Sequence, residues 1–241
     1  MVGPFFGRRG RSIGGACAVA LSISLAAPSF ATGTVKGRVV GMDKLMPDVY
    51  AEAAKPDAHR YTWREPSPTV RPEFRALSAT PPRDLCIAAT VSGTAQPMQP
   101  LLVRVTGGRT EKSTYVVSPG TKLVFENRDP FPHRLVQKEW KAEINAGAQR
   151  DWTAPGPGRF EFRDELFPSV RTYIVVEPQA VGTIYPGRDG AFALGLTPGE
   201  YVLKGYFQGK QVGKQLSVLV KEKFVNDIKD PLNVGEGGEG K

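Results

Sequence analysis

Cysteine and histidine are scarce in this sequence, which has two residues of each type among 241. One cysteine, Cys17, lies in an N-terminal segment that we expect to be removed. The remaining Cys86 cannot form an internal disulfide by itself, so packing has to stabilise the fold. Because Cys86 stands in the apolar run of residues 85–89, we predict a buried, inert thiol, with an intermolecular disulfide as the alternative.

The scarcity of histidine also restricts the catalysis that the chain can perform. A hydrolytic triad needs a histidine between a nucleophile and an acid, and neither His59 nor His133 accompanies a Gly-x-Ser-x-Gly motif. The sequence also lacks a P-loop, a dinucleotide-binding fingerprint and a haem attachment motif. Glu165 could form a glycosidase pair with Glu161 or Asp164, but charged residues on strands and loops are usually solvated. We therefore predict a protein that is not an enzyme.

Long helical patterns are missing as well. No segment keeps a 3.6-residue apolar period for more than about two turns. Short apolar and β-branched runs instead alternate with Gly and Pro turns, which is typical of β-strands. The pattern predicts an all-β protein.

Residues 1–31 have the features of a secretory signal. Three arginines among residues 8–11 precede the apolar residues 13–27, and Ser29 and Ala31 mark a cleavage site before Thr32. The apolar stretch is shorter than the about 20 residues that span a membrane, although an uncleaved anchor is the alternative. We expect a periplasmic or secreted protein without a membrane span after cleavage.

The net charge of +8 comes from basic residues that are scattered along the chain. They form no basic stripe interleaved with aromatic residues, which argues against nucleic-acid binding. A solvated surface is the simplest explanation of the charge.

Behind the signal, the pattern divides the chain into four parts. Residues 32–84 hold an N-terminal strand and a proline-rich extended connection, residues 85–178 a first β domain, residues 179–221 a second, and residues 222–241 a flexible tail. The strand at residues 35–40 is expected to add to one of the sheets, and residues 48–53 form a second short β segment.

Two strands of the first domain are particularly clear. Residues 159–163 alternate polar and apolar, so Phe160 and Phe162 should lie on one face. Residues 172–176 are β-branched and largely apolar, as in a central strand. In the second domain, we expect residues 190–194 to pair with residues 200–207, and residues 208–210 to form a hairpin into residues 211–220.

Several motifs resemble known families. Residues 117–129, with Pro119-Gly120 and Asn127-x-Asp129, followed by His133, resemble the first half of a cupredoxin, and residues 157–162 and 173–176 resemble the second half. Residues 189–192 and 196–201 resemble a carboxypeptidase-regulatory-like β domain. The resemblance implies a Greek-key β-sandwich followed by a smaller prealbumin-like β-sandwich.

The resemblance places the copper ligands of cupredoxins at His133, Asp164, Phe167 and Val170. Blue copper requires a thiolate and two imidazoles, with a weak axial thioether, and only His133 is a suitable ligand. Two apolar side chains would fill the space of the metal instead. We therefore predict a vestigial copper site, with no metal and no other cofactor.

Two alternatives for this region follow from the residues. His133 with Asp164 and Glu165 could make a mixed nitrogen and oxygen site for zinc or a similar cation. Against this, adjacent residues of a strand point to opposite faces, and Arg163 and Arg171 could neutralise the carboxylates. Without a metal, His133 is expected to be a loop histidine hydrogen-bonded to backbone.

Trp140 and Trp152 flank residues 145–147 and would approach each other if this segment were a hairpin. They could form a platform for sugar stacking, or they could seal the edge of a sandwich, which is the more frequent role of large aromatic residues.

These observations predict an exported, non-enzymatic binding or structural module on a degenerate cupredoxin scaffold, with another envelope or secreted protein as its partner. The alternatives are a copper-binding electron-transfer protein with altered ligands and a carbohydrate-binding module. Function depends on such sites rather than on the fold.

Overall fold

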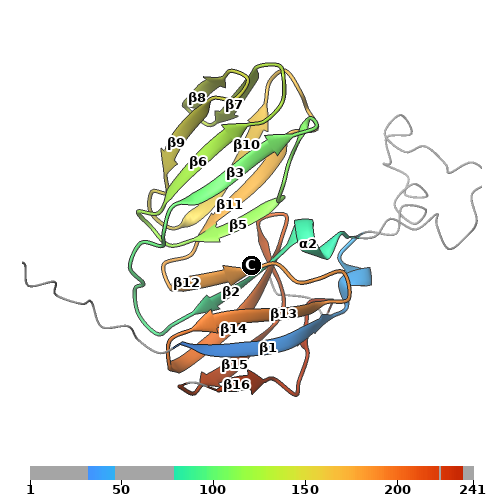
Figure 1. Cartoon of the computed structure of the whole chain (residues 1–241), viewed down its shortest axis with the longest axis vertical. Helices are drawn as coiled ribbons and strands as arrows, with labels where there is room; N and C mark the ends of the chain where they lie inside the picture. Colours follow the sequence, from blue (N-terminus) through green and yellow to red (C-terminus); the bar gives the residue numbers. More distant parts are fainter. Residues whose placement is uncertain (1–31, 47–78, 223, 236–241) are drawn as a thin grey trace, which may run out of the picture. The chain divides into compact units, whose positions relative to one another are not determined.

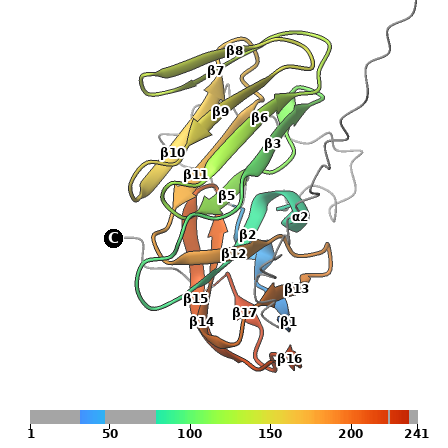
Figure 2. The same cartoon turned by 60° about the vertical axis from the view of Figure 1, so that its left-hand side comes forward.

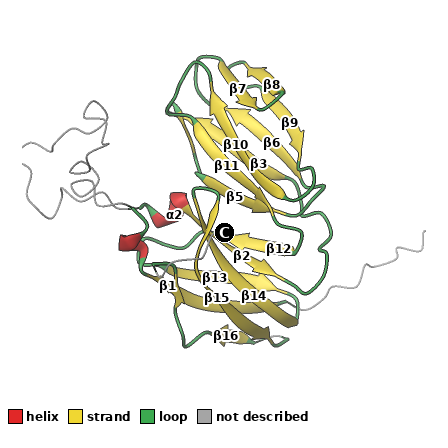
Figure 3. Ribbon diagram, turned by 180° about the vertical axis from the view of Figure 1, so that it is seen from behind, coloured by secondary structure: helices red, strands yellow, loops and turns green. Residues whose placement is uncertain are grey.

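The computed structural model describes residues 32–46, 79–222 and 224–235, where β-strands make up nearly all regular structure (Figure 3). The helical elements of these residues are the 3-10 turn η1 (Met42–Lys44) and the four-residue α2 (Pro81–Asp84), which begins with proline at a position that needs no N–H donor. The predicted all-β fold class is confirmed. The predicted signal, the β segment at residues 48–53 and residues 55–78 of the proline-rich connection lie outside the described residues.

A first sandwich consists of two sheets. One has the order β4-β3-β6-β9 and the other β5-β11-β10-β7-β8. The strands are β3 (Leu101–Thr106), β4 (Arg109–Thr110), β5 (Thr114–Val117), β6 (Lys122–Asn127), β7 (His133–Gln137), β8 (Trp140–Ile144), β9 (Gln149–Thr153), β10 (Gly158–Asp164) and β11 (Arg171–Val176). Two pairs, β3 with β6 and β5 with β11, are parallel, and the other pairs are antiparallel (Figure 2). As predicted, β11 is a central strand.

The core of the first sandwich is organised around Phe162. This side chain is 1% exposed, and its ring centroid lies 4.7 Å from that of Phe125, 5.4 Å from Trp140 and 5.1 Å from Trp152. Phe160 packs into the same core from the same face of β10, as the alternation predicts.

The two tryptophans do not belong to a hairpin. Trp140 lies in β8, which pairs with β7, whereas Trp152 lies in β9, which pairs with β6 in the opposite sheet. Both rings contact Phe162 between the sheets, and Trp152 is only 8% exposed. The tryptophans therefore have the structural role, and they do not form a stacking platform on the surface.

A second sandwich combines segments from both ends of the described chain. One sheet has the order β13-β1-β16, with β17 beside β1, and the other has the order β12-β2-β14-β15. The strands are β1 (Gly33–Val40), β2 (Leu85–Thr90), β12 (Ala180–Ile184), β13 (Ala191–Leu196), β14 (Gly199–Phe207), β15 (Lys210–Val220), β16 (Val225–Asp227) and β17 (Leu232–Asn233). Their inward side chains, such as Val35, Leu85, Phe192 and Leu203, form one apolar cluster.

The first sandwich is inserted into the second. β2 pairs with β12 and β14, and the whole first sandwich lies between β2 and β12 in the chain. This differs from the predicted division at residues 85–178, because β2 belongs to the second sandwich. All six residues of β2 are buried, which fits a central strand covered on both faces.

The predicted pairing of residues 190–194 with residues 200–207 is wrong. β13 pairs with β1 (Figure 1), and β14 pairs with β2 and β15. The chain changes sheets between β13 and β14, so that Leu194 and Leu203 face the same core. The β14–β15 hairpin is confirmed, and its turn residues Gln208 and Gly209 have the positive φ angles, 48° and 71°, that suit a tight hairpin turn.

The connection between β13 and β14 is held by Tyr201. Its hydroxyl donates to the carbonyl oxygen of Thr197 at 2.9 Å and lies 2.8 Å from the Thr197 hydroxyl. This tyrosine corner resembles the one in immunoglobulin-type sandwiches. It gives a structural reason for the tyrosine in the motif of residues 196–201.

The outer face of β2 packs against the first sandwich. Cys86 and Ala88 form a small buried cluster with Val116, Ala180 and Tyr206. Burial raises the pKa of the Cys86 thiol to about 12, as expected of an inert cysteine. Because Cys86 has no exposed surface, the geometry argues against an intermolecular disulfide.

The position of Phe162 leads to a test of the core. Phe162→Ala should lower the free energy of unfolding by about 3–5 kcal/mol, because it leaves a cavity between three aromatic rings. Phe224→Ala is the matched control, since Phe224 is 66% exposed and its replacement should change stability by less than about 0.5 kcal/mol. Urea denaturation monitored by tryptophan fluorescence gives both values, and similar losses in the two variants would contradict this account of the core.

Candidate functional site

The candidate site lies where the β6–β7 and β10–β11 connections meet. His133 is the first residue of β7, and Asp164 is the last residue of β10. The two strands are antiparallel neighbours with Asp164 opposite Leu135, so the end of β10 lies beside the start of β7. This pairing brings together two residues that are 31 positions apart.

The imidazole of His133 bonds a carboxylate at each ring nitrogen. Its Nδ1 lies 2.5 Å from Oδ2 of Asp164, and its Nε2 lies 3.0 Å from Oδ2 of Asp129. All three residues are buried, and His133 has no exposed surface. We call Asp129, His133 and Asp164 the Asp–His–Asp bridge.

Asp164 also organises the loop that follows it. Its Oδ1 accepts hydrogen bonds from the backbone N–H groups of Leu166 at 2.7 Å, Phe167 at 3.3 Å and Arg134 at 3.3 Å. Aspartate is favoured in such turns because its side chain bonds the backbone two or three residues ahead. A carboxylate at this position therefore has a full set of partners.

Asp129 connects the bridge to a third segment, the β3–β4 turn. Its Oδ1 accepts the N–H of Gly107 at 2.5 Å, and its Oδ2 accepts the N–H of Gly108 at 2.9 Å. Both glycines have positive φ angles, 61° and 67°, which glycine adopts without a steric penalty. Burial opposes ionisation of Asp129, but the bonds from Gly108, Gly107 and His133 outweigh it, so the pKa of Asp129 is lowered.

Asn127 holds the loop that carries Asp129. Its side-chain amide donates to the carbonyl oxygens of Phe131 and Ile144, both at 2.8 Å, and its Oδ1 accepts the N–H of Asp129 at 2.8 Å. The Asn-x-Asp motif thus positions the carboxylate beneath His133. The sequence contains the motif, but its spacing alone does not reveal the bond between Asp129 and His133.

Aromatic rings close the site around His133. The ring centroids of Phe131 and Phe167 lie 5.2 and 5.1 Å from that of His133, and 4.6 Å from each other. Val170 is buried in the core of the first sandwich, and its N–H donates to the carbonyl oxygen of Phe167. Three of the predicted copper positions, His133, Asp164 and Phe167, therefore meet, while Val170 packs into the core beside them.

Two expectations for this region are wrong. His133 begins a strand and bonds carboxylates, whereas we expected a loop histidine bonded to backbone. Arg163 and Arg171 pair with Glu161, at 3.8 and 3.2 Å, and do not neutralise Asp164 or Glu165. The alternation of side chains along β10 is the reason, because Glu161 and Arg163 share the outer face.

Asp164 and Glu165 diverge, as their adjacency predicts. Asp164 is buried, while Glu165 is exposed and pairs with Lys141 at 2.8 Å and Arg134 at 3.7 Å. This removes Glu165 from the mixed metal site considered above. In the part of the chain that the structure describes, no group of three or more His, Cys, Asp or Glu residues could hold a metal ion.

The residues present do not fit the copper ion that the resemblance implies. Position 164 supplies a hard oxygen ligand that the backbone already binds, and Phe167 and Val170 cannot coordinate. Both nitrogens of His133 face carboxylates on opposite sides of the ring, so neither is free for a metal. The donor set is that of a hydrogen-bonded bridge.

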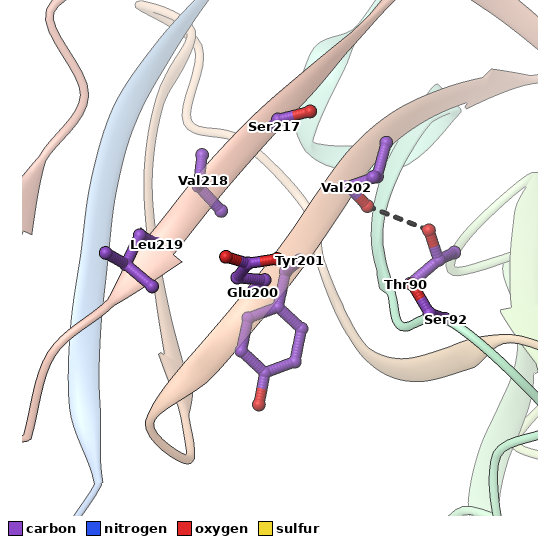
Figure 4. Close-up of a pocket in the computed structure, with 8 residues that line it drawn as sticks. All are labelled: Thr90, Ser92, Glu200, Tyr201, Val202, Ser217, Val218 and Leu219. Carbon is purple, nitrogen blue, oxygen red and sulfur yellow. Dashed lines mark hydrogen bonds between the residues drawn. The ribbon is translucent and has the colours of Figure 1, made fainter.

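A second candidate surface is a pocket beside the last residue of β2, the first residues of β14 and the last residues of β15, with a volume of about 380 Å³ (Figure 4). Thr90 donates a hydrogen bond to the carbonyl oxygen of Val202 at its rim, and Leu219 is 57% exposed. Glu200 adds one carboxylate. The lining is thus mixed, and it offers both apolar contact and hydrogen-bonding groups.

Comparison with known proteins identifies no matching family model and no matching curated protein. Solved structures with partial likeness include a reduced amicyanin mutant (18% identity, 37% of this chain and 99% of amicyanin, TM-score 0.30). A purple cupredoxin from Nitrosopumilus maritimus matches with 16% identity over 32% of this chain and 99% of its own, at a TM-score of 0.30.

A Cu-containing nitrite reductase (NirK) from Thermus scotoductus SA-01 also matches, with 19% identity and a TM-score of 0.31. The likeness spans 32% of this chain and 22% of the reductase chain. Among the described residues, no helix has the length and hydropathy to cross a membrane.

The Asp–His–Asp bridge should stabilise the fold strongly. His133→Phe keeps a ring in the buried space but leaves two buried carboxylates without their imidazole partner, so the free energy of unfolding should fall by about 3–5 kcal/mol. Arg134→Gln is the control at the next position, where loss of exposed ion pairs should cost less than about 1 kcal/mol. Chemical denaturation distinguishes the two, and equal losses would show that the bridge contributes little.

Proposed function

We propose that this chain is an exported, non-enzymatic binding module built on a degenerate cupredoxin scaffold, and that its partner is another envelope or secreted protein. The observation that carries the proposal is the Asp–His–Asp bridge, which occupies the position where the resemblance places copper. The arginines at residues 8–11, the apolar residues 13–27 and the small residues Ser29 and Ala31 support export.

The bridge supports a binding role because its imidazole is not available for metal or acid–base chemistry. Electron transfer by blue copper requires a thiolate and free imidazole nitrogens. Here the retained imidazole is fully buried, and both its nitrogens are engaged. A scaffold without redox chemistry can still function by binding a partner through its surface.

The second sandwich supplies the surface with the most suitable features. β15 has eleven residues and forms one end of its sheet, so its outer edge can accept an additional extended segment. Leu219, on this strand, is 57% exposed and lines the pocket. An exposed large apolar side chain at a pocket is a suitable contact for a partner.

The tyrosine corner at Tyr201 and the motif of residues 196–201 support the assignment of the second sandwich as a carboxypeptidase-regulatory-like β domain. Such a domain would act here as a rigid structural and binding unit. The proposed contact surface is the pocket beside β15 (Figure 4).

A photoreactive amino acid at Leu219 tests the proposed surface. It should form a discrete adduct with one exported protein in the cell envelope or medium, because Leu219 points into the pocket region. The same amino acid at Leu102, an exposed leucine of β3 in the first sandwich, is the matched control. Mass spectrometry identifies the adduct; equal labelling from both positions, or none from Leu219, would contradict the proposal.

The degenerate character of the copper site can be tested by restoring ligands. The variant Asp164→Cys, Phe167→His, Val170→Met supplies the missing thiolate, imidazole and thioether, so it should bind copper and show the intense visible absorption of a copper–thiolate bond. The unmodified protein is the control and should retain no stoichiometric copper or zinc after loading and dialysis. Stoichiometric metal in the unmodified protein that is lost in His133→Ala would instead favour a metal protein with altered ligands.

A further inference from the structure

The hydrogen bonds of the Asp–His–Asp bridge restrict where its protons can lie. Both oxygens of Asp129 accept backbone N–H groups: Oδ1 accepts from Gly107 and Oδ2 from Gly108. Neither oxygen can therefore carry a proton directed at these glycines. The lowered pKa of Asp129 makes this carboxylate an acceptor, so its 3.0 Å contact with His133 places a proton on Nε2 of the imidazole. One ring nitrogen is thereby assigned as a donor.

The second ring nitrogen faces Asp164. Oδ1 of Asp164 accepts three backbone N–H groups, and its other oxygen, Oδ2, faces the ring. The 2.5 Å contact between Oδ2 and Nδ1 requires a proton between these two atoms, and we place it on Nδ1 because imidazole is ordinarily a stronger base than a carboxylate.

We infer that His133 is an imidazolium cation that joins two buried carboxylates, so that a doubly protonated histidine takes the place of the metal ion in this scaffold. The bridge ties three connections together: the β3–β4 turn through Gly107 and Gly108, the β6–β7 loop through Asp129, and the β10–β11 loop through Asp164. The positive charge of His133 attracts both buried carboxylates, and this attraction holds the connections together in place of bonds to a metal.

The described charged side chains next to the bridge point elsewhere. Arg128 pairs with Glu126 at 2.8 Å, and Arg134 pairs with Glu143 at 3.4 Å. From the β10–β11 loop, Glu165 pairs with Lys141, and the phenyl rings of Phe131 and Phe167 pack against the imidazole. The two carboxylates are therefore the groups that determine the charge of His133.

Loss of either ring contact would leave a buried carboxylate without its imidazole partner, which is costly in a buried site. The bridge therefore holds the three connections to one another.

Nitrogen-15 NMR of the histidine ring tests the inference directly. His59→Gln leaves His133 as the one histidine of the chain, and metal-free protein in chelator is used at pH 7. Both ring nitrogens should show the chemical shift and the directly bonded proton of protonated imidazole, with the proton on Nδ1 shifted far downfield. One nitrogen at the unprotonated shift would overturn the inference, because the second proton would then lie on Asp164.

Amide hydrogen exchange gives a second readout. Asp164→Asn should speed exchange of the Leu166 and Phe167 amides by about tenfold, since an amide side chain cannot accept from both the backbone and His133. Glu165→Gln, which alters the adjacent exposed carboxylate, should leave these rates unchanged. Equal effects of the two variants on these exchange rates would contradict the role given to Asp164 in the Asp–His–Asp bridge. Because neither experiment involves the partner protein, their outcome is independent of the crosslinking result at Leu219.

Discussion

Burial of two carboxylates at one end of a β-sandwich is unfavourable unless each finds donors, and this constraint explains the local structure there. The glycine turn between β3 and β4, the Asn127 loop and the turn after β10 each supply backbone N–H groups to Asp129 or Asp164. The imidazole of His133 lies between the two carboxylates and bonds both. The three connections at this end of the first sandwich are thus held by hydrogen bonds.

The two sandwiches show how differently their cores are specified. In the first, strands alternate around Phe162, and large aromatic side chains from both sheets meet there. In the second, the side chains on one face of β2 pack into the core of that sandwich, and those on the other face pack against the first sandwich. Insertion of the first sandwich between β2 and β12 requires only that these two strands remain paired.

The two sandwiches differ in what they present. The end of the first sandwich holds the buried Asp–His–Asp bridge, while the second has a pocket that Leu219 lines, and Leu219 is 57% exposed. The proposed binding role therefore rests on the surface of the second sandwich.

The local pattern of the sequence determined the all-β class, the common face of Phe160 and Phe162, and the β14–β15 hairpin, because alternation and turn residues are local properties. It also determined that positions 164, 167 and 170 lack the thiolate, imidazole and thioether of a blue-copper site, because ligand chemistry belongs to the residue type. Only the tertiary structure decided that β2 pairs with β12 and β14, that β13 pairs with β1, and that Asp129 and Asp164 converge on His133. These contacts join segments far apart in the chain, and strand periodicity carries no information on which distant edge becomes the partner.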